Sequence, residues 1–298
     1  MIFRKNKPEN KIIFEEKSFW DKESEKSLLW ISKIEKNKFI NRLKKKSVWW
    51  HRYIKPLHNK IILDLGCGTE DNYTSYLILS GNKLVGVDLS ENTIKINKFL
   101  LDKLGIKSII FNSNKSIDVK RIFNRKKNLR AILVVANAED LPFKNKQFDA
   151  IHIKWILHHT QSIPHALKSV NKSLKIGGLF ICTESNLLHP PRWITQVNFL
   201  RSINIFRYLA IKYGPLDPNE MARTPNAYLK MIKKAGFEID VVDFKYEFEC
   251  FYYVARLFIK NKLILNIAKK MDRFILLFEF PKYFAMDIKI LARKVKDI

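Results

Sequence analysis

The sequence has few cysteines and no long apolar segment. Its three cysteines, Cys67, Cys182 and Cys250, show no metal-ligand spacing, which argues against a disulfide framework and against a zinc site. No run of 18 apolar residues predicts a membrane span, and the charged start of the chain lacks the apolar stretch of a signal peptide. Internal repeats and low-complexity linkers are also missing. We therefore expect a globular, cytoplasmic protein with one main domain from these 298 residues, 47% of them hydrophobic.

Acidic residues are scarce as well, because 29 Asp and Glu face 55 Lys and Arg, for a net charge of +26. The excess is uneven: residues 1–60, 105–130 and 251–298 carry +10, +7 and +7. The intervening segments are nearly neutral. Lysine supplies 42 of the 55 basic residues, a balance that suits a solvated surface better than bidentate recognition of phosphate.

Two apolar runs end in residues typical of a nucleotide pocket. The first, Ile61-Ile-Leu-Asp-Leu-Gly-Cys-Gly-Thr69, ends in Asp64, Gly66 and Gly68, and the second, Val85-Gly-Val-Asp-Leu-Ser90, ends in Asp88. The pattern predicts two parallel strands whose carboxyl ends meet. Asp88 follows Gly68 by 20 residues, the spacing at which a carboxylate at a strand tip can accept from both hydroxyls of a ribose. The ligand predicted is one that contains a ribose.

The charged residues that follow Gly66 and Gly68 indicate which nucleotide would bind there. A dinucleotide fingerprint requires a third glycine where this chain has Asp71, and Glu70 stands next to it. Both carboxylates would repel a pyrophosphate in a partly desolvated site. S-adenosylmethionine (SAM) carries a sulfonium and an ammonium group and no phosphate, so the charge favours SAM over NAD. The two carboxylates would also complement the dipole of a helix that begins there.

Five stretches together resemble the class I SAM-dependent methyltransferases, within the branch that acts on small molecules, quinones, lipids and glycans. The likeness covers residues 60–185, roughly, in the family's order and spacing. The chain departs from the family's usual pattern at three positions: it has Glu70 where the family usually has glycine, Asn137 where aspartate is common, and Ile176 where proline is usual. The stretches are Leu63–Thr69, Gly86–Ser90, Asn137–Phe143, Phe148–His159 and Leu174–Phe180.

The resemblance implies a role for each matching residue. Backbone from Gly66 to Gly68 would hold the methionine part of SAM, and Asp88 would hold the ribose hydroxyls. Asn137 and the Ala138 amide would meet the adenine edge, which suits an amide oxygen as acceptor and a backbone N–H as donor. No metal is expected. The full set of expected cofactor residues is Asp64, Gly66, Cys67, Gly68, Asp88, Leu89, Asn137, Ala138 and Glu139.

Catalysis in such a family needs little machinery, because the sulfonium already activates the methyl group. The enzyme has to place a nucleophile in line and exclude water, and a hydroxyl nucleophile also gains from a base. His158 and His159 follow the fourth motif strand, where the family places its acceptor, and His159 is the preferred candidate base. The alternative is that it only shapes the pocket. Side chains expected on the acceptor side are Trp155, Glu184 and Asn186.

The expected fold is α/β, a doubly wound, mostly parallel seven-stranded sheet with an antiparallel last strand. Residues 1–59 are predicted to form a helical extension that is either a lid over the SAM site or a cover for one face of the sheet. Residues 60–298 form the methyltransferase domain, with a basic insertion at 105–130. The predicted strands are 61–65, 83–87, 131–136, 148–153, 178–183, 237–248 and 285–295, and helices are predicted near 70–80, 91–104, 163–174 and 223–235.

A helical insertion is predicted at 251–284, before the last strand. It has a basic amphipathic pattern, in which apolar residues recur from Ile264 to Phe278 and Lys262, Lys269, Lys270 and Arg273 share the other face. Such a helix either packs its apolar side on its own protein or lies on an anionic membrane surface, here through residues 255–279. The expected location is the cytoplasm, and the alternative is peripheral attachment to the inner membrane surface.

The function predicted is methyl transfer from SAM to an oxygen of a small-molecule, lipid or glycan acceptor. An RNA methyltransferase would explain the charge, but the Asn or Asp-Pro-Pro-aromatic motif of base-amino methyltransferases is replaced here by Lys154-Trp-Ile-Leu157. A protein that binds SAM or its demethylated product S-adenosylhomocysteine (SAH) without catalysis is the third hypothesis. Glu70, in the position of a glycine, keeps it open.

Overall fold

The computed structural model describes residues 9–45, 48–69, 73–111, 116–189, 221–245, 252, 255, 261–275 and 283–298. The predictions for Glu70, Asp71, Cys250 and Phe278 lie outside these residues. The main elements, in chain order, are α1 (Glu9–Ser32), α2 (Lys36–Lys44), η1 (Trp49–Arg52), β1 (Ile61–Leu65), α3 (Tyr73–Leu79), β2 (Lys83–Asp88), α4 (Glu91–Lys103), β3 (Ser108–Ile110), α5 (Val119–Arg125), β4 (Ala131–Val135), β5 (Phe148–Lys154), η2 (Leu157–His159), α6 (Ile163–Ser173), β6 (Leu174–Ser185), α10 (Pro225–Lys234), β7 (Phe237–Lys245), α12 (Lys262–Ile275) and β8 (Asp287–Lys294).

The strands form one sheet in the order β3-β4-β2-β1-β5-β6-β8-β7. Pairing is parallel from β3 to β6, and β8 runs antiparallel to both β6 and β7. The doubly wound α/β class and the antiparallel last strand are thereby confirmed. The described sheet has eight strands where seven were predicted, because β3 is a three-residue edge strand inside the segment interpreted as a basic insertion. Three residues are too few to show a strand period.

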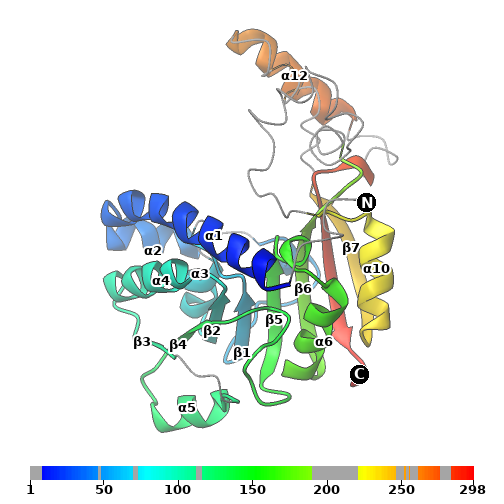
Figure 1. The fold of residues 1–298 in the computed structure, drawn as a ribbon. Coiled ribbons are helices and arrows are strands. Elements are labelled where there is room, and N and C mark those ends of the chain that lie inside the picture. Colours follow the sequence, from blue (N-terminus) through cyan, green and yellow to red (C-terminus); the bar gives the residue numbers. More distant parts are fainter. Residues whose placement is uncertain are drawn as a thin grey trace.

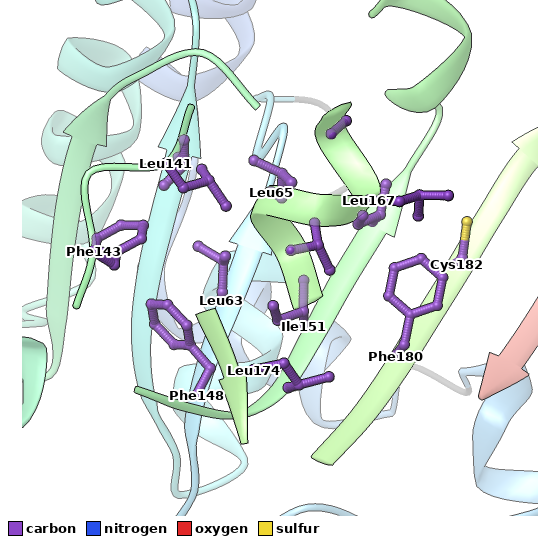
Figure 2. Packing of buried hydrophobic residues seen from close by; sticks show 14 of the residues in the cluster. Leu63, Leu65, Leu141, Phe143, Phe148, Ile151, Leu167, Leu174, Phe180 and Cys182 are labelled. Carbon is purple, nitrogen blue, oxygen red and sulfur yellow. The ribbon is translucent and has the colours of Figure 1, made fainter. Parts of the chain in front are cut away.

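Helices cover both faces of the sheet, which explains the continuous apolar runs of its central strands (Figure 1). Alternate residues of one strand enter different clusters: Leu63 packs with α5, α6 and α10 side chains, while Ile62 packs with α2, α3 and α4. Figure 2 shows part of the first cluster, where Leu63, Ile151 and Phe180 of neighbouring strands lie with Leu167 of α6. The buried strands thus place the polar residues of the motifs at their ends.

Helix α1 crosses the carboxyl-terminal edge of the sheet beside α4 (Figure 1). Asp21 accepts from the Ser90 hydroxyl at 2.6 Å and from the Asn92 amide at 3.2 Å, so α1 is tied to the beginning of α4. Ser27 of α1 is hydrogen-bonded through its hydroxyl to that of Thr69, at 2.6 Å. The N-terminal extension therefore contacts the motif residues directly.

The segment 105–130 carries β3 and α5 and packs on the first cluster through Val119 and Phe123, both fully buried. Asp118 caps α5 by accepting from the Arg121 amide at 3.0 Å. Most of its described basic side chains are exposed, namely Lys107, Lys120, Arg121, Arg125, Lys126 and Lys127, whereas Arg130 is partly buried and donates to the carbonyls of Ile78 and Asn82. The segment is thus a packed part of the fold with a charged outer surface.

Helix α12 lies apart from the sheet, at the top of Figure 1. The side of the helix that packs against the rest of the protein carries Ala268 and Asp272, both of which are buried. The Asp272 carboxylate accepts from the Tyr252 amide at 2.8 Å. The apolar stripe next to this side is exposed in Leu263, Ile264, Ile267, Met271 and Phe274, by 42 to 69%. The choice between the two alternatives for this helix, packing on the protein's own core and attachment to a membrane surface, stays a prediction. None of the helices described is both long enough and apolar enough to cross a bilayer.

Candidate active site

A cavity of about 250 Å³ lies at the carboxyl ends of β1, β2, β4 and β5 and is closed from above by α1. The chain leaves β1 for β2 on one side and returns to β5 on the other, so the cavity sits at the switch point where doubly wound folds bind ligands. Ten of the eleven predicted site residues line it; His158 does not. The ten are Asp64, Gly66, Cys67, Gly68, Asp88, Leu89, Asn137, Ala138, Glu139 and His159.

The glycine loop after β1 exposes bare backbone to this cavity. Gly66 and Gly68 have φ angles of 69° and 43°, in the left-handed region that favours glycine. The amides of Gly66 and Cys67 both donate to the Val87 carbonyl, at 2.8 and 2.9 Å, which fixes the loop against β2. A Cβ on Gly66 would lie 1.9 Å from Cδ1 of Ile156. The first glycine is therefore required both by its backbone angle and by the space available.

Asp88 ends β2 and holds the glycine loop through its carboxylate. Its Oδ2 accepts from the Gly68 amide at 3.1 Å, and its Oδ1 accepts from the Ser90 amide at 2.9 Å. Burial raises the pKa of Asp88 to about 6, against these two N–H donors, which lower it. A carboxylate this costly to bury gains from any further hydroxyl donor or positive charge. Each oxygen has a second lone pair with which to accept one.

Residues 137–139 turn under the opposite wall of the cavity. The Asn137 side-chain oxygen accepts from the Glu139 amide at 3.0 Å, so one of its lone pairs serves the turn. The Glu139 carboxylate accepts from the Gln161 amide at 2.6 Å and the Ser162 amide at 3.2 Å. Glu139 therefore joins the expected adenine side to the segment that leads into α6. The adenine role of Asn137 and Ala138 stays a prediction.

Asp64 and His152 form a buried pair beneath the glycine loop. The Nδ1 atom of His152 lies 2.7 Å from Oδ1 of Asp64, and the Thr74 hydroxyl donates to Oδ2 at 2.6 Å. The Tyr73 ring lies against His152, with 4.6 Å between ring centroids. Both oxygens of Asp64 thus have protein partners. Neither His152 nor Tyr73 was among the predicted site residues, although His152 lies within the Phe148–His159 stretch, because Asp64 meets His152 only through β1–β5 pairing and Tyr73 arrives from α3.

The loop after β5 separates the two adjacent histidines into different environments. His158 is buried, and its Nδ1 is 2.6 Å from Oε2 of Glu184, whose other oxygen accepts from the amides of Ile156 and Leu157 at 3.0 and 2.8 Å. Burial raises the pKa of Glu184 to about 7, against the opposing effect of these amides. The ring centroids of His158 and His159 are 4.2 Å apart with the rings tilted at 41°, and His159 lines the cavity.

Of the three side chains expected on the acceptor side, Trp155 lines the cavity. It has a φ of 57°, and its indole N–H donates to Asp287 at 3.0 Å. A non-glycine residue held in this region carries backbone strain, which proteins tend to retain at functional sites. Glu184 supports the loop from below, and Asn186 donates to the carbonyls of Tyr283 and Ala285, at 2.7 and 2.8 Å.

Helix α1 supplies the roof, which the motifs did not indicate. Trp20 meets the His159 ring edge-on at 5.4 Å, and its indole N–H donates to Oε2 of Glu16 at 3.1 Å. The Nδ1 atom of His159 lies 3.7 Å from the same Glu16 oxygen. The residues of α1 that line the cavity are Ile12, Ile13, Glu16, Trp20, Glu23 and Ser24.

Comparison with known proteins agrees with this geometry. A family model described as "Methyltransferase domain" matches residues 63–182, the segment from β1 to β6 that contains the glycine loop and both histidines. An uncharacterised protein of Methanocaldococcus jannaschii, MJ1252, is 30% identical over 269 residues, which cover 89% of this chain and 86% of that protein. The chain belongs to the class I SAM-dependent methyltransferases.

Characterised relatives of this methyltransferase domain match over a shorter stretch. A demethylmenaquinone methyltransferase of Symbiobacterium thermophilum is 28% identical over 155 residues, which cover 49% of this chain and 53% of that protein. The alignment thus spans about half the length of that relative. A solved SAM-dependent methyltransferase of Mesorhizobium loti shares the fold, with a TM-score of 0.51 and 15% identity over 84% of this chain and 99% of that one.

The cavity suits SAM, the family's cofactor. Asp88 and Asp64 bring negative charge to the end where the ligand's ribose and cationic groups would lie, and the glycine loop leaves backbone uncovered. Among the residues described, no group of three or more His, Cys, Asp or Glu side chains is arranged to hold a metal ion. The expectation of SAM as cofactor is confirmed by the family to which the chain belongs.

Proposed function

We propose that the protein transfers a methyl group from SAM to an oxygen of a small-molecule, lipid or glycan acceptor. One observation supports this above the others: a single cavity is lined both by the cofactor motifs and by His159 with two tryptophans. A site that only stored the cofactor would not need a titratable ring and an aromatic surface next to it. The family membership of residues 63–182 is consistent with this activity.

When bound, SAM supplies a methyl group activated by its sulfonium. The protein's own residues have three tasks. Asp88 orients the ribose, the Gly66–Gly68 backbone holds the methionine end, and Asn137 with Ala138 meets the adenine. Helix α1 excludes water from above, which strengthens the electrostatic interactions inside the cavity. His159 is the group that would take the acceptor's hydroxyl proton.

The acceptor side would be formed largely by aromatic and apolar side chains, because Ile12 and Trp20 of α1 and Trp155 and Ile156 of the β5 loop line the cavity. Such walls favour an acceptor with a flat or apolar body. The relatives named for demethylmenaquinone support a quinone-type small molecule. Loss of a proton from a phenolic hydroxyl raises electron density both on the oxygen and on ring carbons, so ring carbon is the second position at which such an acceptor could be methylated.

Methyl transfer is tested by incubating the protein with SAM labelled in its methyl group and with organic-solvent extracts of cells. We expect label in the organic phase and SAH in the aqueous phase, and mass spectrometry with NMR of the product distinguishes O-methylation from C-methylation. His159→Asn should reduce the rate by about a hundredfold or more if the histidine is the base. Micromolar SAM binding without SAH formation on lipid, quinone, glycan and RNA fractions would instead support a binding protein.

We further propose that α12 attaches the protein to an anionic membrane surface. Its exposed apolar stripe includes Ile267 and Phe274, 50 and 62% exposed, and the adjoining surface carries the exposed cations Lys262, Lys269 and Lys270. Apolar side chains that enter the lipid boundary and lysines at the level of the headgroups are the two contributions that hold such helices on bilayers. Attachment there would bring the cavity close to lipid-soluble acceptors.

Co-sedimentation with vesicles tests the attachment. The protein should pellet with vesicles of phosphatidylcholine and phosphatidylglycerol at 0.1 M salt, less at 0.5 M, and little with phosphatidylcholine alone, because salt screens the lysines. Ile267→Ser/Phe274→Ser should abolish pelleting. The matched control is Phe99→Ser, which removes a side chain 47% exposed on α4. Equal pelleting of the two variants would refute a role for α12.

A further inference from the structure

The candidate base, His159, contacts helix α1 through the carboxylate of Glu16. Glu16 lies in the first half of α1, is 4% exposed, and lines the cavity together with His159. Its Oε2 accepts from the Trp20 indole at 3.1 Å and is 3.7 Å from Nδ1 of His159. The Trp20 ring also contacts the edge of His159. Three side chains from two separate parts of the chain thus form one contact group.

A buried carboxylate next to one ring nitrogen has a defined chemical effect. It favours the tautomer with the proton on the near nitrogen, Nδ1, and leaves Nε2 as the nitrogen that can accept a proton. It also stabilises the imidazolium once Nε2 has accepted one. The Trp20 N–H restricts the carboxylate to one orientation, as an orienting group does for the acid of a nucleophile–base–acid array.

From this arrangement we infer that Glu16 is the positioning residue for His159, so that α1 completes the acid–base apparatus as well as closing the cavity. The inference rests on the proposed methyl transfer to a hydroxyl. In that reaction the hydroxyl proton passes to Nε2 of His159, the oxygen's electron pair forms the bond to the methyl carbon, and the carbon–sulfur bond breaks with its pair left on sulfur. Glu16 remains a carboxylate throughout.

Other titratable groups around His159 have to be accounted for. They include His158, whose ring centroid lies 4.2 Å from that of His159, and Glu184 behind it, whose pKa is lowered by the His159 charge although burial raises it overall. Glu23, Glu139 and Lys154 line the same cavity. His158 and Glu184 belong to elements of the sheet domain, so they would act on His159 whether or not α1 is in place. Glu16 belongs to α1 and is the α1 carboxylate with a contact to the His159 ring, at 3.7 Å.

The experiment is an NMR titration of the histidine rings in the full-length protein, with the His159 signal assigned from His159→Asn. In Glu16→Gln, which keeps the size and an acceptor for Trp20, His159 should titrate about one pH unit lower than in the wild type. The matched control, Glu25→Gln, makes the same change in charge at an exposed position of α1 and should leave His159 unchanged. Thermal melts check that both variants fold.

A second variant separates positioning from a merely structural role. Trp20→Phe keeps an aromatic edge but removes the N–H that Glu16 accepts, so the carboxylate interacts more strongly with His159 and the ring should titrate at the same or a higher pH. A wild-type titration pH in Glu16→Gln, or equal downward shifts in both variants, would overturn the inference. With an acceptor, the acid limb of the rate profile should move to lower pH in Glu16→Gln. Absence of any methyl transfer would refute the proposed function, while the NMR shift would still report the pair.

Discussion

Replacing Asp88 by alanine should separate binding of SAM from stability of the fold. The carboxylate is partly buried at the end of β2, and at neutral pH the rise of its pKa from 3.8 to about 6 corresponds to a cost of about 3 kcal/mol to the folded protein. That cost is tolerated for the sake of a ligand if Asp88 binds the ribose. Asp88→Ala removes it together with the two bonds to the amides of Gly68 and Ser90.

The loss in affinity follows from the bonds that Asp88 would make. Two ribose hydroxyls donating to a carboxylate contribute about 1.5 kcal/mol each at the lower end of the range for charged partners. Together they amount to about 3 kcal/mol, or a dissociation constant for SAM about a hundredfold higher in Asp88→Ala. Water that enters the vacated space would reduce the effect, so tenfold is about the smallest change consistent with the role.

Two measurements on the same samples test this. Isothermal titration calorimetry gives the affinity for SAM, and thermal melts without ligand give the stability, which we expect to be unchanged or higher in Asp88→Ala. Asp102→Ala is the control, because it removes an exposed aspartate that pairs with Lys98 on α4. If Asp88→Ala binds SAM as the wild type does, the ribose role is wrong. If affinity and melting temperature fall together, Asp88 is a structural residue of the loop.

Three further predictions follow from the same site. Gly66→Ala should abolish detectable SAM binding, whereas Gly177→Ala, with a similar φ of 72° but nothing within 4 Å of the added carbon, should lower only the stability, by about 1 kcal/mol in urea unfolding. The SAM affinity should rise about tenfold between pH 5 and pH 7.5, because SAM favours the ionised form of Asp88, whose pKa is about 6 in the free protein. In calorimetry, Asp88→Ala should show no such dependence of the affinity on pH. Glu184→Ala should destabilise the protein by about 3 kcal/mol at pH 5.5 and by less at pH 8. The folded-state pKa of Glu184 is raised to about 7, so the stabilising contribution of this side chain is lost as the pH rises. Urea unfolding at the two pH values measures the difference.

The motifs of residues 60–185 contained enough local information to predict β1, β2, β4 and β5 to within one residue, whereas β6 begins at Leu174, four residues before the predicted start. The signal for these strands is local, because it consists of apolar runs that end in Asp64 and Asp88 and of the spacing between them. Strands β1 and β2 do occupy Ile61–Leu65 and Lys83–Asp88. The edge strand β3 was missed because three residues show no period, and its pairing with β4 is a tertiary contact. Likewise the amphipathic pattern of α12 could not tell which side of the helix would be covered.

For the candidate site, the sequence by itself determined the residues whose function depends on backbone shape and spacing: the glycine loop, Asp88 and the turn at Asn137. It left open which of two adjacent histidines faces the cavity, because the answer depends on Glu184 of β6, which draws His158 into the core. It also left open the role of α1. Glu16 lies more than a hundred residues from His159 in the chain. Only the tertiary structure, by laying α1 across the carboxyl ends of the strands, brings that carboxylate to the ring.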